Sequence, residues 1–146
     1  MSDKKIIMLI GKTMSGKTTL KQYLNRQALV YKKTQAIEFS DNIIDTPGEY
    51  LELRGMYRAL MVTSVDADLI VLVQDVDQED SMFAPGIASM FTKPVIGVVT
   101  KADIAKDEAQ VAHAIGHLER AGAERVFVTS SVEGSGFEEL AAYFED

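Results

Sequence analysis

Cysteine is missing from all 146 residues of this chain. A disulfide framework and a thiolate metal site are therefore excluded, and a cytoplasmic location is the default expectation. No apolar run approaches the ~20 residues that a membrane-spanning helix needs. A cluster of lysine and arginine is also missing, and the formal net charge is −7. Because contacts with phosphate dominate nucleic-acid affinity, the acidic balance argues against a nucleic-acid partner.

The remaining composition, 47% hydrophobic and 25% charged, is typical of a globular protein. A chain of this length can bury one sizeable core, and neither a repeat nor a linker interrupts it. We expect a single domain over residues 1–146, as a monomer or a weak dimer. The apolar run at residues 5–10 is predicted to be a strand rather than a secretion signal, since no small-residue cleavage site follows it.

Strand and helix patterns alternate along the chain with short connections. This alternation predicts a three-layer α/β fold: a mostly parallel sheet with helices on both faces. Ser40 and Asp41 favour a tight turn, so a short antiparallel edge strand is expected beside an otherwise parallel sheet of six strands. The predicted strands are 5–10, 36–39, 42–45, 69–76, 95–100 and 125–129.

The clearest helix signals lie in the C-terminal half. Asp107 is a predicted N-cap with Gln110 reaching back to it, and Gly122 supplies a left-handed residue at the C-terminal end. His113 and His117 lie four apart on this helix, but without a neighbouring carboxylate of the zincin type we interpret them as surface residues. Shorter helical segments are predicted at 85–91 and 135–144.

The most informative motif is Gly11-Lys12-Thr13-Met14-Ser15-Gly16-Lys17-Thr18, which fits G-x-x-x-x-G-K-[ST] between a strand and a helix. In that context, backbone N–H groups at a helix N-terminus hold a triphosphate. Lys17 is predicted to place a charge on the outer phosphates, and Thr18 to bind Mg²⁺. The predicted nucleotide-binding residues here are Gly11, Lys12, Thr13, Met14, Ser15, Gly16, Lys17, Thr18 and Thr19.

A second phosphate-side signal is the D-x-x-G segment Asp45-Thr46-Pro47-Gly48, at the end of an apolar strand. Asp45 is expected to face Mg²⁺, and the Gly48 N–H to bond the terminal phosphate. Thr34 is the candidate threonine that closes over Mg²⁺ and that phosphate.

Glu49 stands where hydrolytic switches usually carry glutamine to orient the attacking water. A carboxylate beside a polyanionic phosphate is electrostatically unfavourable unless it is protonated or screened by a metal. Two interpretations stay open: Glu49 is a catalytic base, or it marks slow hydrolysis.

The segment Thr100-Lys101-Ala102-Asp103, at another strand end, has the form of a guanine-binding motif, N/T-K-x-D. Asp103 is predicted to accept from the guanine N1–H and exocyclic amine, which adenine does not offer as a pair. The Lys101 stem is expected to pack over the base, and Thr100 to brace the phosphate loop. Ser130 and Ser131 end the last strand at the same edge, where the Ser131 N–H can meet the guanine O6.

With these motifs in order, the chain resembles the ethanolamine- and propanediol-utilisation family EutP/PduV, within the Ras-like, translation-factor type P-loop GTPases. The likeness covers essentially the whole chain. It is carried by Ile10–Leu20, Ile44–Tyr50, Phe83–Ala88 and Lys93–Asp103.

This resemblance implies a Ras-like fold that binds Mg²⁺ and GTP or GDP, with ATP as a further possibility. It also implies a role in bacterial catabolism of ethanolamine or propanediol, in association with microcompartments and in contact with a shell protein. Thr100 stands where the wider GTPase group has asparagine, which predicts softer guanine selectivity.

Three functional hypotheses follow from these patterns. The leading one is a Mg²⁺-dependent GTP-binding switch with slow hydrolysis, in which Lys17, Thr34 and Glu49 are the catalytic candidates. The second is a small-molecule kinase of acetate-kinase type that uses ATP or GTP. The third is an adaptor that docks on a shell protein and holds its nucleotide structurally.

Overall fold

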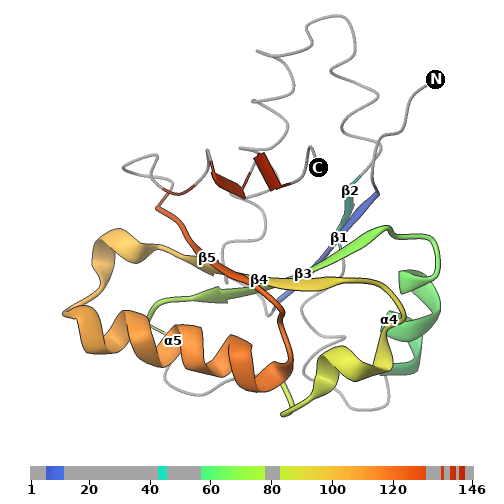
Figure 1. Ribbon diagram of the computed structural model, residues 1–146, viewed down its shortest axis with the longest axis horizontal. Helices are drawn as coiled ribbons and strands as arrows, with labels where there is room; N and C mark the ends of the chain where they lie inside the picture. The colour runs from blue at the N-terminus through green and yellow to red at the C-terminus, as the bar shows by residue number, and fades with distance from the viewer. Residues whose placement is uncertain are drawn as a thin grey trace, which may run out of the picture.

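The computed structural model describes residues 6–11, 43–45, 57–77, 83–130, 136, 139–140 and 142–143. Within them the chain forms an α/β fold around a five-stranded sheet with the order β2-β1-β3-β4-β5 (Figure 1). The strands are β1 (Ile7–Ile10), β2 (Ile43–Asp45), β3 (Leu69–Asp75), β4 (Val95–Thr100) and β5 (Val126–Val128). The helices are α4 (Tyr57–Ser64), α5 (Glu108–Ala121) and the 3₁₀ turns η3 (Ile87–Met90) and η4 (Ala102–Ile104).

All four strand pairings in the described residues are parallel. Within the described residues, the expectation of six strands with an antiparallel edge is therefore corrected to five parallel strands. The predicted strand at 36–39 lies outside these residues. β2 pairs with β1 through Leu9 and Asp45, at the end of a connection (11–42) long enough for the crossover that parallel strands require.

Alternate residues of the buried strands separate two apolar cores, one on each face of the sheet. On one face, Leu72 of β3 packs with Leu60 of α4 and Leu118 of α5. On the other, Val71 packs with Leu140. Figure 1 shows α4 and α5 on one side of the sheet and the helical residues 139–140 and 142–143 on the other. The three predicted layers are thus present.

Helix α5 follows the local signals of its sequence. The Asp107 carboxylate accepts a hydrogen bond from the Gln110 N–H at 2.9 Å, and the Gln110 side-chain oxygen accepts from the Lys106 N–H at 2.7 Å. Gly122 ends the helix with a φ of 105°. Gly97 of β4 lets the helix approach closely, since a Cβ there would lie 2.9 Å from the Leu118 Cδ1.

Helix α4 is held at its C-terminal end by a residue distant in the sequence. The Lys93 ammonium donates to the backbone carbonyl of Val65 at 3.1 Å and to that of Ala67. Lys93 lies just before β4, so it ties the end of α4 to the start of that strand. Among the described residues, no helix has the length and apolar character needed to cross a bilayer.

Candidate nucleotide-binding site

The carboxyl ends of the parallel strands meet at one edge of the sheet, where ligands bind in open α/β folds. Gly11 follows β1 there and is buried, and Asp45 ends the neighbouring β2. Because Asp45 pairs in register with Leu9, the two predicted phosphate-side motifs begin on adjacent strands. The predicted residues that lie outside the described part of the chain are Lys12, Thr13, Met14, Ser15, Gly16, Lys17, Thr18, Thr19, Thr34, Gly48, Glu49 and Ser131.

At the end of β4, backbone hydrogen bonds to both neighbouring strands fix the predicted base-binding segment. The Val76 N–H donates to the Thr100 carbonyl at 2.9 Å, and the Ala102 N–H to the Thr129 carbonyl at 3.0 Å. Thr100 is buried, and its hydroxyl donates to the Gln74 carbonyl at 3.4 Å. These hydrogen bonds hold the segment between the ends of β3 and β5.

Lys101 has a left-handed backbone, with φ 61° and ψ 36°, and is the non-glycine residue with positive φ in the described part of the chain. Such a conformation costs free energy for a residue with a Cβ, and such costs are concentrated at functional sites. The turn leads directly into η4, whose first two residues are Ala102 and Asp103. It therefore separates the buried strand from an exposed carboxylate.

Asp103 is exposed to solvent and is positioned by a buried serine of the neighbouring segment. The Ser130 hydroxyl donates to the Asp103 Oδ1 at 2.7 Å, and Ser130 itself is fully buried. Thr129 holds this segment to β4, because its N–H and hydroxyl both donate to the Val99 carbonyl, at 2.8 and 3.0 Å. The structure thus brings three predicted base-site residues together: Lys101, Asp103 and Ser130.

The arrangement suits a ligand that presents adjacent N–H donors. A carboxylate accepts through two oxygens, and one bond from Ser130 leaves acceptor positions for a ligand on an exposed group. Guanine has the matching pair of donors, so these residues fit a guanine base. Mg²⁺ prefers oxygen ligands, and Asp45 is an aspartate at the end of β2, beside the strand that precedes the predicted phosphate loop, so its residue type fits that requirement.

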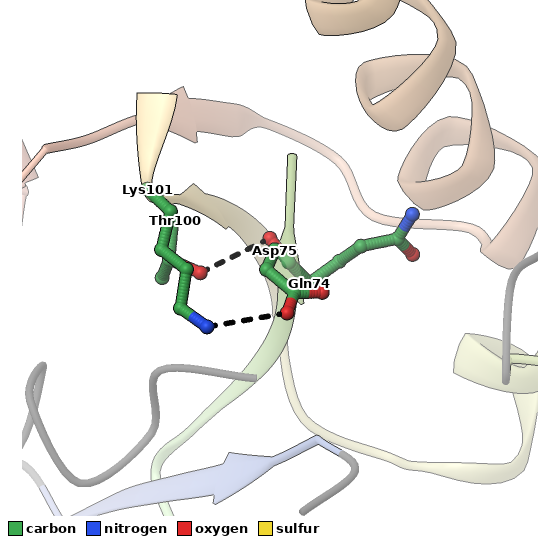
Figure 2. A network of polar contacts seen from close by, with 4 residues as sticks. All are labelled: Gln74, Asp75, Thr100 and Lys101. Atoms are coloured by element: carbon green, nitrogen blue, oxygen red, sulfur yellow. Dashed lines mark hydrogen bonds and ion pairs between the residues drawn. The ribbon is translucent and has the colours of Figure 1, made fainter. Parts of the chain in front are cut away.

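The sequence analysis missed two polar residues at the end of β3. The Asp75 Oδ2 lies 3.5 Å from the Lys101 Nζ, and the Asp75 side chain is 9% exposed against 40% for Lys101. Gln74, immediately before it, is fully buried. Figure 2 shows the Lys101 ammonium reaching the Asp75 carboxylate, while the Gln74 side chain extends to the opposite side of the strand. The signal in the sequence that could have found them is a pair of polar residues at the end of an otherwise apolar strand.

His113 and His117, interpreted as surface residues, form a side-chain pair on α5. Their Nε2 atoms are 3.1 Å apart, and an Arg120 guanidinium nitrogen lies 3.1 Å from the His117 Nδ1. Among the described residues, no group of three or more potential metal ligands includes them. Away from this pair, partial burial of Tyr143 and the nearby Glu124 carboxylate raise the pKa of the tyrosine hydroxyl.

The fold corresponds to that of P-loop GTPases. The G domain of the FeoB iron transporter from T. maritima matches with a TM-score of 0.58 over 94% of each chain, at 24% identity. GTPase Era of Sinorhizobium medicae is 29% identical over 96% of this chain, which spans 52% of that protein. Together with the site geometry, these likenesses define a Ras-like P-loop GTPase fold.

The family can be stated more narrowly. The family model PduV-EutP, described as "Ethanolamine utilisation - propanediol utilisation", matches residues 4–146. The propanediol utilization protein PduV of Citrobacter freundii is 47% identical, over 93% of this chain and 90% of that protein. The probable acetate kinase EutP of Escherichia coli K12 is 31% identical, over 95% and 88% respectively. The chain belongs to the PduV-EutP family.

Proposed function

We propose that this protein binds a guanine nucleotide with Mg²⁺ and acts as a slowly hydrolysing switch in ethanolamine or propanediol utilisation. The observation that carries the proposal is the Asp103 carboxylate, exposed, fixed by Ser130 at 2.7 Å and two residues beyond the left-handed Lys101. A pre-positioned carboxylate lowers the ordering cost of base binding. Family membership supports the context of ethanolamine or propanediol utilisation. A location in the cytoplasm, in association with a microcompartment, is part of the proposal.

On the phosphate side, the proposal rests on the sequence motifs. The phosphate loop from Gly11 to Thr18 would hold the phosphates, with Lys17 on the outer ones. Mg²⁺ would be held by Thr18, Thr34 and Asp45. When bound, it would neutralise charge on the terminal phosphates. Glu49 keeps its two interpretations, as a base or as the cause of slow turnover.

The test is a calorimetric titration of the purified protein with GDP, GTP, ADP and ATP in the presence of Mg²⁺. We expect the guanine nucleotides to bind at least tenfold more tightly than the adenine nucleotides, because adenine leaves the Asp103 carboxylate unpaired. Lys17→Ala should abolish detectable binding of GTP without lowering the melting temperature of the free protein. Equal affinities for ATP and GTP would contradict the guanine assignment.

A second candidate function is phosphate transfer to acetate. It is favoured by the 31% identity to a protein named a probable acetate kinase. Nucleotide turnover should then rise with acetate and yield acetyl phosphate, and Glu49→Gln should lower that rate by two or more orders of magnitude if Glu49 is a base, a loss of ~3 kcal/mol. If Glu49 instead slows hydrolysis, the same variant should hydrolyse GTP modestly faster. Turnover that acetate leaves unchanged would exclude the kinase.

The third hypothesis, a shell-docking adaptor, is separated from the switch by its nucleotide dependence. Under a switch, Lys17→Ala changes association with shell protein, whereas under an adaptor it leaves association unchanged. Co-sedimentation of the full chain with assembled shell protein measures the difference.

A further inference from the structure

Asp75 is a nearly buried carboxylate at the centre of the ligand-binding edge. It is the last residue of β3, which lies between β1, the strand before the phosphate loop, and β4, the strand before the base-binding segment. Its Oδ2 lies 3.5 Å from the Lys101 Nζ, and its Oδ1 is buried without a hydrogen-bond partner among the described residues. In the register of β3 and β4, Asp75 pairs with Thr100, which directly precedes Lys101 in the sequence.

The packing of β3 alone does not account for a carboxylate at this position. Val73 and Val71 occupy the same face of the strand two and four residues earlier, and both are buried in the apolar core. Burying a carboxylate oxygen without a partner opposes folding. Departures of this kind from consistent packing are expected at functional sites. The ion pair with Lys101 indicates which function is served.

Lys101 spans the gap between β4 and β3 and is constrained at both ends. Its backbone is fixed in the left-handed region, and its ammonium reaches the carboxylate on the neighbouring strand (Figure 2). The four-carbon stem between these points runs from the end of β4 toward the end of β3. A lysine side chain that is ordered before binding loses less entropy when a ligand packs against its stem.

We propose that Asp75 is a positioning residue for purine recognition, acting by anchoring the Lys101 ammonium so that the stem forms a fixed shelf for the base. The inference rests on the proposed nucleotide function and deepens it. Asp103 reads the donor groups on the edge of the base, whereas the Asp75–Lys101 pair supports its face. The two sites therefore differ in what they detect: Asp103 detects the 2-amino group, and the shelf does not.

The test compares Asp75→Asn with wild-type protein for GDP and for IDP, which lacks the 2-amino group. Loss of the anchor should weaken both nucleotides by the same factor, about fivefold, the cost of ordering one long side chain on binding. Asp103→Ala serves as the matched comparison, because it should weaken GDP more than IDP. Affinities come from displacement of a fluorescent GDP analogue, and the melting temperature of each free variant reports its fold.

A double-mutant cycle separates positioning from a general structural effect. In a Lys101→Met background, which keeps an apolar stem without the ammonium, Asp75→Asn should change GDP affinity by less than about twofold. Lys101→Met alone, at a 40% exposed side chain, should fold and lose at least as much affinity as Asp75→Asn, so it tests the inference even where Asp75→Asn fails to fold.

Three outcomes contradict the inference. They are unchanged GDP affinity in Asp75→Asn, unchanged affinity in Lys101→Met, and a fivefold loss from Asp75→Asn that persists in the Lys101→Met background. Wild-type protein that binds GDP in the same assay leaves the proposed function standing while these outcomes remove only the role of Asp75. Wild-type protein that binds neither GDP nor IDP overturns both.

Discussion

The ends of β3 and β4 lie side by side but accommodate their polar residues differently. At the end of β4, the Thr100 hydroxyl, the backbone of Ala102 and the Asp103 carboxylate all have hydrogen-bond partners. At the end of β3, both side-chain polar atoms of Gln74 and the Oδ1 of Asp75 are buried without a hydrogen-bond partner in the part of the chain that the structure describes. The last residues of β3 and β4 occupy equivalent positions in the sheet, but the free-energy cost of their polar side chains is higher on β3.

The difference arises from the neighbouring strand that supplies hydrogen-bond partners. β4 is followed in the sheet by β5, whose continuation offers the Thr129 carbonyl and the Ser130 hydroxyl. At the end of β4, these partners therefore hold the exposed Asp103 carboxylate in place. From the β4 side, the Lys101 ammonium contacts the Asp75 carboxylate. On β3, the buried polar side chains oppose stability, and the Asp75 carboxylate contacts the base-binding segment through the Lys101 ammonium.

The largest expected effect comes from breaking recognition at the β4 end. Asp103→Asn replaces one acceptor by an amide donor, which opposes the donors of guanine but matches the C2 carbonyl of xanthine. We expect GDP affinity to fall ~100-fold and xanthosine diphosphate affinity to rise above it, since a hydrogen bond to a charged group is worth ~1.5–3 kcal/mol. Isothermal titration calorimetry with both nucleotides measures the change.

The matched control is Asp107→Asn, the same chemical change four residues further along the chain. Asparagine caps a helix about as well as aspartate, so α5 should remain intact and GDP affinity should stay within a factor of two of wild type, on the order of the scatter expected for a distant surface site. Equal losses from the two substitutions would show that general acidity, not the position of Asp103, decides binding.

A smaller effect tests the β3 end. Gln74→Met removes an unpartnered amide while keeping a side chain of similar length, so the free energy of unfolding should rise by ~1–2 kcal/mol. Gln74→Glu, which buries a carboxylate in the same place, should lower it. Urea unfolding monitored by circular dichroism gives both values. Destabilisation by methionine would mean that the amide makes a bond that offsets its burial.

Local features of this fold were predicted from the sequence. The Asp107 cap, the returning Gln110 and the left-handed Gly122 are confirmed, because each depends on residues within four positions of itself. The strand at 95–100 is confirmed for the same reason, since its continuous apolar run needs no distant partner to be recognised. The segment predicted to be helical at 85–91 proved to be a 3₁₀ turn, which starts only after Gly86 with φ 74°.

Features that depend on register were not predicted. Asp75 meets Lys101 across 26 positions of sequence, and only the alignment of β3 with β4 brings them together. The Ser130 hydroxyl contact with Asp103 likewise depends on where β5 ends beside β4, although both residues were candidates. Sequence patterns therefore predicted the candidate base-site residues, while the contacts that hold them in place follow from the alignment of the strands.

The smallest expected effect comes from removing a hydrogen-bond partner at the end of β4, so that its carboxylate, like the one at the end of β3, has an oxygen without a protein donor. Ser130→Ala leaves Asp103 in place but removes the hydroxyl that fixes its Oδ1 at 2.7 Å. GDP affinity should fall by a factor of ~3–10, about 0.7–1.4 kcal/mol, which is the range of a typical net intramolecular hydrogen bond. Because Asp103 is exposed, water can solvate the released oxygen, so the loss should stay well below that of Asp103→Asn.

The control is Thr129→Val, which removes a neighbouring hydroxyl that donates to the Val99 carbonyl instead. This variant should lower stability more than GDP affinity. A loss of GDP affinity from Ser130→Ala as large as that from Asp103→Asn would show that the serine binds the nucleotide directly.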